Sequence, residues 1–397
     1  NQDYLEQQLS QAMHTTVRME KFNATWHGFE PEIHITGLHI YHPQYPSVVI
    51  MGIPHVKLEL ALWQSLLQWD VRLDGQVDGV NLNLVQDASG QWAIEELLAL
   101  GESRPEVRQT AANWLLAQAE WQLAQTNVVI RPSQKPAIQL HNLSLQNQNR
   151  GSKHQFRVQG LFNQQPFKLF ADLQATGDIF QAQTWQGQVY TQLPVQPWHQ
   201  WLTKPIISDS QIIKAEFGGD YWLTLEAGQV QEVTAQVLVP DLQIRYQQQD
   251  ITLQQFSAQL SWQQQQPYWQ ATLEQAQGRI NQQAGVLKQF SMEQATPSSL
   301  FIGLQELDIA QIAPVLASLK LTPPLLKTWL IQAQPTGKIS KLWADIDSKP
   351  FRINKISAQL QQLSALATQK IIGCHQVDIW LNHQNKQGYA GVKIANG

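Results

Sequence analysis

The chain has 397 residues, of which 43% are hydrophobic and only 15% are charged, against roughly 25% charged residues in an average soluble protein. Its net charge of −4 at pH 7 provides no basic field that would attract nucleic acid, so we expect no nucleic-acid partner. The single cysteine, Cys374, excludes an intrachain disulfide. Glutamine largely replaces the missing charge. The length suffices for two or three globular units or for one extended unit.

The first residues predict a helix over residues 3–19, which would cap the end of a sheet. The apolar positions that fall on one stripe of the 3.6-residue period are Tyr4, Leu5, Leu9, Ala12 and Met13. A membrane-surface role is the alternative, but the polar face lacks the lysine and arginine residues expected for it. No run of 18 or more apolar residues occurs, so we expect no transmembrane helix within this sequence.

A short pattern recurs about every hundred residues, with apolar residues at its positions 1, 3, 6 and 8. It occupies residues 33–40, 138–145, 251–258 and 351–358. The step from position 3 to position 6 reverses the alternation of a strand. A β-bulge or tight bend at that step keeps the apolar side chains of both halves on one face. The recurrence predicts repeated β-units stacked along one axis, with chance recurrence as the alternative.

Residues 56–94 form the stretch around which the chain is organised. Apolar and polar residues alternate from Val56 to Leu62 and again from Val80 to Leu84, which predicts strands with one buried face. Residues 63–67 break the alternation and predict a corner. The Asp-Gly pairs at residues 74–75 and 78–79 predict turns. This stretch builds a surface and places no group for chemistry.

Helical segments interrupt an otherwise alternating sequence. We expect helices over residues 95–124, 307–319 and 324–331, and a Pro-punctuated connection over residues 193–201. On the order of twenty strands remain. The fold class predicted is therefore mainly β with a few short helices, arranged as an elongated, curled antiparallel sheet with an apolar groove. A closed two-sheet sandwich is the alternative.

We find no constellation typical of catalysis, and we expect no catalytic residue, no cofactor and no metal site. His34, His39 and His42 lie close in sequence, but exposed polar strand positions explain them better than metal ligation does. Cys374 beside His375 is better explained as a small apolar residue than as a nucleophile, because nothing nearby in the sequence orients the pair.

Two motifs carry a resemblance to a known family. The first is the order of an alternating strand, Ser-Leu-Leu at residues 65–67, a second alternating strand, Gly-Gln-Trp-Ala-Ile at residues 90–94 and Glu-Leu-Leu at residues 96–98. The second is Leu-Leu-Lys-Thr-Trp-Leu at residues 325–330, followed by residues 334–342, Gln-Pro-Thr-Gly-Lys-Ile-Ser-Lys-Leu. Together they resemble the AsmA-like envelope proteins of Gram-negative bacteria, which include TamB. The second motif and the order of the two favour the YhdP branch, of which this chain resembles the N-terminal periplasmic part.

The resemblance implies a periplasmic location with anchoring to the inner membrane through an N-terminal helix outside this sequence. It implies a bridge-like protein whose groove shields phospholipid acyl chains between the inner and outer membranes and so supports the permeability barrier. Phospholipids are then the expected partners, with outer-membrane or envelope proteins as partners of a further C-terminal part. The alternative is a structural scaffold for the assembly of outer-membrane proteins. We divide the chain into residues 1–20 (helix), 21–204 (first β-unit with a helical insertion) and 205–397 (second β-unit).

Strand alternation selects the side chains that would line the groove. They are Val56, Leu58, Leu60, Val80, Leu82, Leu84, Ile138, Leu140, Ile251, Leu253, Phe351 and Ile353. Parity establishes which of them share a face within one strand. It leaves open whether that face meets lipid or a sealed protein core.

Overall fold

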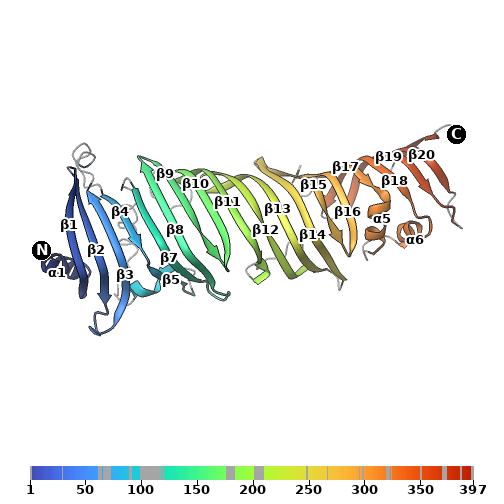
Figure 1. Cartoon of the computed structure of the whole chain (residues 1–397). Coiled ribbons are helices and arrows are strands. Elements are labelled where there is room, and N and C mark those ends of the chain that lie inside the picture. The colour runs from blue at the N-terminus through green and yellow to red at the C-terminus, as the bar shows by residue number, and fades with distance from the viewer. Residues whose placement is uncertain are drawn as a thin grey trace. The chain divides into compact units, whose positions relative to one another are not determined.

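The computed structural model describes residues 2–28, 30–60, 65, 73–88, 92–98, 118, 120–175, 184–200, 210–246, 249–265, 267–294, 296, 299–318, 322, 324–348, 351–368, 373–384 and 387–394. Strands account for most of them, joined into open, mainly antiparallel sheet with a few short helices, as the sequence predicts (Figure 1). The chain forms two compact units. Unit 1 comprises Asn1–Pro194 and Thr224–Gln229, and unit 2 comprises Val195–Leu223 and Val230–Gly397.

Unit 1 begins with a helix and continues as a sheet. Its elements are α1 (Gln2–Ala12), β1 (Val17–His27), β2 (Glu30–Tyr41), β3 (Val49–Leu60), β4 (Leu73–Asp78), β5 (Asn81–Gln86), β6 (Trp92–Ile94), α3 (Glu95–Leu98), β7 (Glu120–Arg131), β8 (Ile138–Arg150), β9 (Lys153–Phe162), β10 (Gln165–Ala175) and most of β11 (Trp185–Pro197). Neighbouring strands pair antiparallel, except that β4 and β5 lie one after the other along β7 and pair with it in parallel.

Unit 2 is an antiparallel meander. It contains η2 (Trp198–Gln200), most of β12 (Ser210–Glu226), β13 (Gln229–Tyr246), β14 (Gln249–Gln265), β15 (Tyr268–Ile280), β16 (Gln283–Gln294), β17 (Ser299–Asp308), α5 (Ile309–Ser318), α6 (Pro324–Gln332), β18 (Thr336–Ser348), β19 (Phe351–Ala365), β20 (Cys374–Gln384) and β21 (Gln387–Ile394). From β13 to β21 each strand pairs with the next along the chain. The helices α5 and α6 confirm the two helical segments predicted at residues 307–319 and 324–331.

A left-handed backbone conformation recurs in the middle of the strands. It occurs with φ between 48° and 62° at Gly37, Gln125, Asn142, Gln255, Gln275, Glu306, Gln362 and Gln376. The residue two positions before each of them is apolar. The residue directly after each of them points to the apolar face again. Register shifts accompany several of them, as at Gln125 and Asn142. The left-handed residue therefore reverses the alternation and lets a strand bend without moving its apolar side chains to the other face.

The bulge predicted from the recurrent pattern is confirmed. In three of the four segments the left-handed residue occupies position 5, as Gly37, Asn142 and Gln255. In the fourth segment the pairing of β18 with β19 shifts between Ile353 and Lys355, without a positive φ. Glycine suits such a position because it has no β-carbon, whereas asparagine and glutamine adopt it at some cost in free energy.

Some sequence predictions are wrong in their boundaries. The helix predicted over residues 3–19 ends at Ala12, because His14 takes φ 51° and Val17–Met19 instead pair with β2. The helix predicted up to residue 124 does not reach it, since β7 begins at Glu120. The Asp74-Gly75 turn is instead part of β4, while Gly79, with φ 76°, does turn the chain. The corner predicted at residues 63–67 lies outside the described residues except for Ser65.

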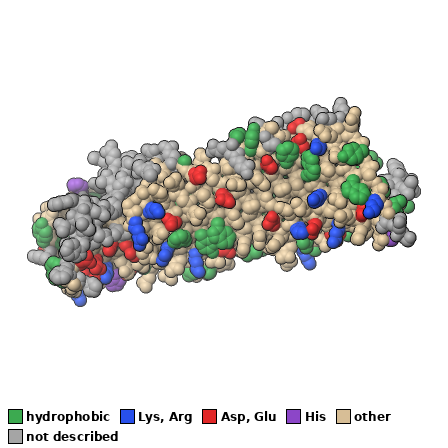
Figure 2. All heavy atoms as spheres, turned by 90° about the horizontal axis from the view of Figure 1, so that it is seen from above, with side chains coloured by type: hydrophobic (Ala, Val, Ile, Leu, Met, Phe, Trp, Pro, Cys, Tyr) green, Lys and Arg blue, Asp and Glu red, His purple; other side chains and the backbone are tan. Residues whose placement is uncertain are grey.

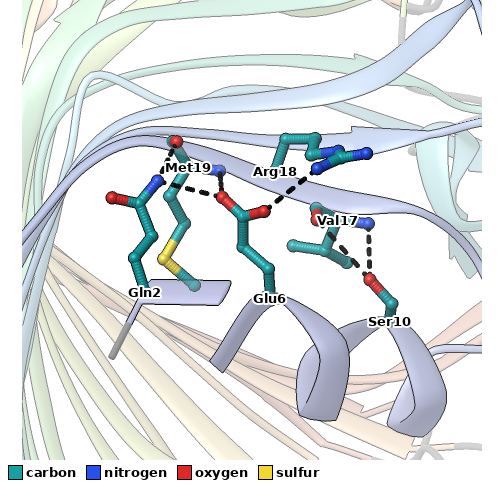
Figure 3. Close-up of polar contacts among 6 residues, drawn as sticks. All are labelled: Gln2, Glu6, Ser10, Val17, Arg18 and Met19. Carbon is teal, nitrogen blue, oxygen red and sulfur yellow. Dashed lines mark hydrogen bonds and ion pairs between the residues drawn. The ribbon is translucent and has the colours of Figure 1, made fainter. Parts of the chain in front are cut away.

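The helix α1 packs along the free edge of β1 and replaces a neighbouring strand with side chains (Figure 3). The Met19 N–H donates to Glu6 Oε1 at 2.8 Å, and the Val17 N–H donates to Ser10 Oγ at 2.9 Å. Gln2 Nε2 donates to the Met19 carbonyl oxygen at 2.6 Å. Positions 2, 6 and 10 recur every four residues, so they project from one side of the helix. The part of the edge at Val17 and Met19 is thereby closed to pairing with another strand, in line with the predicted capping role.

The Glu6 carboxylate is the centre of this cap. Its residue is 8% exposed, and the Arg18 guanidinium lies 3.4 Å from Oε2. Burial by itself would raise the pKa of Glu6, but the hydrogen bonds from Gln2 and the Met19 N–H, together with the charge of Arg18, lower it below the usual value. A lowered pKa in the folded state means that this contribution to stability is present at neutral pH. It is lost as the pH falls through the lowered pKa.

We expect Glu6→Ala to weaken the docking of α1 by about 1–3 kcal/mol, because the Met19 N–H is left buried without an acceptor. The protection factors of the Val17 and Met19 amides against hydrogen exchange should fall, and acid should lower the same protection factors in the unmodified chain, after correction for the intrinsic exchange rate at each pH. The exposed neighbour Gln7 provides the matched control, Gln7→Ala. Unchanged exchange at Met19 in Glu6→Ala would show that the cap does not depend on this carboxylate.

We expect opposite effects from two substitutions at Gln255, which is exposed with φ 49°. Gln255→Gly should stabilise unit 2 by about 0.5–1 kcal/mol, and Gln255→Val should destabilise it by about 1–2 kcal/mol, because a β-branched residue tolerates the left-handed region poorly. Gln259→Val, at an exposed position of the same strand with ordinary φ, is the control. Thermal unfolding measures all three. Equal midpoints for the glycine and valine variants would contradict the assigned strain.

Candidate functional site

One face of the sheet in unit 1 carries an unbroken apolar row that runs across the strands. Residues directly opposite one another in a ladder share a face. Following these partners from β1 to β10, one residue per strand and passing directly from β4 to β7, gives Phe22, Ile35, Val56, Val77, Leu123, Leu145, Val158 and Leu169. We call this set row 1. It ends at Thr191 on β11.

Unit 2 carries a row of the same kind. From β13 to β20 the direct partners are Ala235, Leu260, Leu273, Phe290, Leu304, Leu342, Ala358 and Leu381. We call this set row 2. Parallel to it runs a further apolar row of Ala276, Leu287, Leu307, Ile339, Leu360 and Ile379. Each unit thus presents a band of hydrocarbon that extends along the sheet and perpendicular to its strands.

The apolar face is neither a sealed core nor a bare surface. In row 1 only Ile35 is buried, and the other members are partly exposed. In row 2 Ala235 and Ala358 are buried, the leucines and Phe290 are partly exposed, and Leu381 is 42% exposed. The residues that follow the left-handed positions are mostly buried, among them Leu143, Leu307 and Val377. The deepest part of each curl therefore lies at the bends, and a partly accessible apolar band flanks it.

The opposite face is polar and holds the strands through side-chain ladders. Lys57 Nζ lies 3.0 Å from Glu32 Oε2, and Lys288 Nζ lies 2.7 Å from Glu306 Oε1. Glutamine side chains bridge neighbouring strands, as from Gln289 to Glu274. In the view of Figure 2, uncharged polar side chains and backbone make up most of the described surface, with charged side chains and small hydrophobic patches scattered over it. Glutamine serves this face because it is hydrated without concentrating charge.

The groove candidates of unit 1 fall on the apolar face, and several meet across β7. Leu82 and Leu140 both pair with Val128, while Leu84 and Ile138 both pair with Ile130. Val56 belongs to row 1. Leu58 and Leu60 lie farther along β3, opposite Ile33 and Leu73 respectively. Val80 differs from the others, because it sits in the connection between β4 and β5 and is 4% exposed.

The candidates of unit 2 lie on the other side of the bends from row 2. Ile251 pairs with Ile244, and Leu253 pairs with Leu242 and Ile280. Ile353 pairs with Ile346 and is 43% exposed, and Phe351 lies in β19 opposite Ser348. Sequence reasoning missed row 2 as a set. The signal available was the second half of the recurrent pattern at residues 251–258, which contains Ala258 and leads into Leu260.

The polar residues that were weighed as chemical groups lie in ordinary strand surroundings. His34 contacts Glu32, and His39 Nε2 lies 3.2 Å from Glu20 Oε1, both on the polar face. Cys374 Sγ contacts the Leu363 carbonyl oxygen, and the His375 ring lies by Ser364 instead. Within the described ranges, no group of three or more His, Cys, Asp or Glu side chains is arranged to hold a metal ion.

The described helices are short. None of them combines the length and the apolar character needed to cross a bilayer.

Comparison with known proteins assigns the family. The family model described as YhdP protein matches residues 1–396. No curated protein and no solved structure matches significantly. The match extends over nearly the entire chain and agrees with the open β-sheet and its apolar rows, so this chain belongs to the YhdP family, a branch of the AsmA-like proteins of the Gram-negative envelope.

Proposed function

We propose that this chain is part of a periplasmic, bridge-like lipid transfer protein. In this proposal, phospholipid acyl chains lie on the apolar face of each unit while the head groups stay in water, and the lipid passes between the inner and outer membranes. The protein is anchored at the inner membrane. The lipid that it passes to the outer membrane supports the permeability barrier there. Family membership supports an envelope lipid-transport role.

The observation that carries the proposal is the combination of continuity and accessibility in rows 1 and 2. Row 2 places an apolar side chain on every strand from β13 to β20 without a polar interruption, and most of these side chains are partly exposed. An acyl chain that covers such a band gains about 0.8 kcal/mol for each methylene removed from water. A band without a tight pocket holds the chain in many positions of similar free energy.

The protein's own part in the mechanism is passive. The left-handed bends keep the apolar side chains on the inside of the curl, and the ion pairs and glutamines keep the other face hydrated. No step of bond making or breaking is needed. The work of moving lipid in one direction then falls to a gradient or to a partner.

We expect the gently purified chain to carry phospholipid in several copies, detected by native mass spectrometry and identified after extraction. Leu304→Glu should reduce the bound lipid several-fold, because a carboxylate placed in the apolar band must be desolvated by an acyl chain. Gln305→Glu, the exposed neighbour on the polar face, is the control and should retain its lipid.

The unfolding midpoint of Leu304→Glu separates two explanations for lost lipid. A midpoint within a few degrees of the unmodified chain means that Leu304 lines a binding surface. A lipid-free, cooperatively folding unmodified protein would contradict the proposal. It would favour the alternative, an assembly scaffold for outer-membrane proteins.

A further inference from the structure

A polar pair interrupts the apolar face of unit 1 in the row next to row 1. That row passes through Ile33, Leu58, Gly75, Trp121, Asn147, Phe156, Ala171 and Val189, each directly opposite the next. Trp121 and Asn147 are cross-strand partners on β7 and β8, each two residues from a member of row 1 (Figure 1). Asn147 is fully buried, with an exposure of 0%.

These two side chains leave a hydrogen-bond donor and an acceptor unused at the same place. Among the described residues, three side chains have a buried nitrogen or oxygen atom without a partner, and two of these atoms are Trp121 Nε1 and Asn147 Oδ1. The Asn147 amide nitrogen donates to the Gln155 carbonyl oxygen at 3.4 Å, which orients Oδ1 away from that carbonyl. The third atom, His39 Nδ1, belongs to a residue of the polar face. Leaving such groups unpaired disfavours the folded state, and their coincidence on an apolar face offers a donor and an acceptor to a ligand.

The Asn149 side chain, two residues along β8, has partners for both its oxygen and its nitrogen. Asn149 Oδ1 lies 2.7 Å from His154 Nδ1, and Asn149 Nδ2 donates to the Gln118 carbonyl oxygen at 2.7 Å. Burial lowers the pKa of His154, which is therefore uncharged at neutral pH. Along β8 the face thus changes from Leu145 through Asn147 to Asn149. This order, from hydrocarbon to uncharged hydrogen-bonding groups, matches an amphiphile that lies with its chain on row 1.

The packing beside Trp121 leaves room for a ligand to enter. Its partner on β4 is Gly75, and a β-carbon at Gly75 would meet only Leu58 Cδ2, at 3.5 Å. Access to Asn147 then requires the indole to move toward Gly75, where β4 carries no side chain. A side chain larger than glycine on β4 would occupy that space.

We propose that Trp121 and Asn147 form a subsite for the uncharged part of a glycerolipid that carries a free hydroxyl, such as an acylglycerol or a lysophospholipid, in which Trp121 Nε1–H donates to an ester carbonyl and Asn147 Oδ1 accepts from the hydroxyl. The inference rests on the proposed function. No cation lies in this row or in row 1, so the pair suits a neutral group and not a phosphate. The site gives one position along an otherwise uniform face a preference for the region where chain and head group meet.

The test uses the full chain after delipidation and two probes of equal chain length, oleoyl glycerol and the corresponding unsaturated hydrocarbon. The double variant Trp121→Phe, Asn147→Leu removes the donor and the acceptor, with a smaller aromatic ring at residue 121 and a side chain of similar shape at residue 147. We expect it to bind oleoyl glycerol about tenfold more weakly, which is the loss expected for two hydrogen bonds. Its affinity for the hydrocarbon should be unchanged. Equal loss for both probes, or no loss for either, overturns the inference.

Unfolding midpoints of the delipidated proteins provide a second measurement. We expect the single variant Asn147→Leu to match or exceed the unmodified chain, because an unpaired polar group has been replaced by an apolar one of similar shape. Asn149→Leu, which removes a paired side chain of the same strand, should lower the midpoint. A comparable fall in Asn147→Leu would mean that its unpaired oxygen serves the fold, for instance through a buried water, and would overturn the subsite. Failure of the unmodified chain to bind either probe would instead overturn the proposed function itself.

Discussion

The structure depends on one local constraint, the left-handed residue in the middle of the strands. A strand of regular alternation that bends sharply would turn some of its apolar side chains toward water. The left-handed residue costs about 1–2 kcal/mol for a side chain other than glycine. The residue that follows it gains more when it is large and apolar, since burying a leucine contributes about 1.5–3 kcal/mol. Leu143, Leu307 and Leu363, each less than 9% exposed, show where that gain is made.

The polar elements have a different task, which is to keep a single layer of sheet from pairing or stacking with others. Exposed ion pairs such as Lys288–Glu306 contribute little to stability, but they keep the outer face hydrated. The edge of β1 is more prone to unwanted pairing than the outer face, because its N–H and C=O groups could pair with any extended chain. The three polar side chains of α1 satisfy those groups at Val17 and Met19 without adding a strand.

The sequence predicted the helices and strands better than it predicted which residues of neighbouring strands lie opposite one another. The step from position 3 to position 6 in the recurrent pattern was sufficient to locate bulges at Gly37, Asn142 and Gln255. Pro324 and the apolar run after it were sufficient to locate α6. The first helix was extended too far because Val17 and Met19 also fit its stripe, and only pairing with Ile40 and Leu38 makes them a strand. Rows 1 and 2 could not be derived, since parity within a strand does not establish which residue of the next strand lies opposite. The pair Trp121 and Asn147 was missed for the same reason.

The rows run across the strands, and this gives the apolar face a repeat length. Moving along a row by one strand is a step of about 4.8 Å, after which a flexible chain meets nearly the same contacts again. The free-energy profile along the face is then a shallow corrugation, in which successive small barriers replace one deep well. Thermal motion is enough to carry a bound chain over such barriers in either direction. Under the proposed function, movement of lipid along each unit is in that sense closer to one-dimensional diffusion than to binding and release.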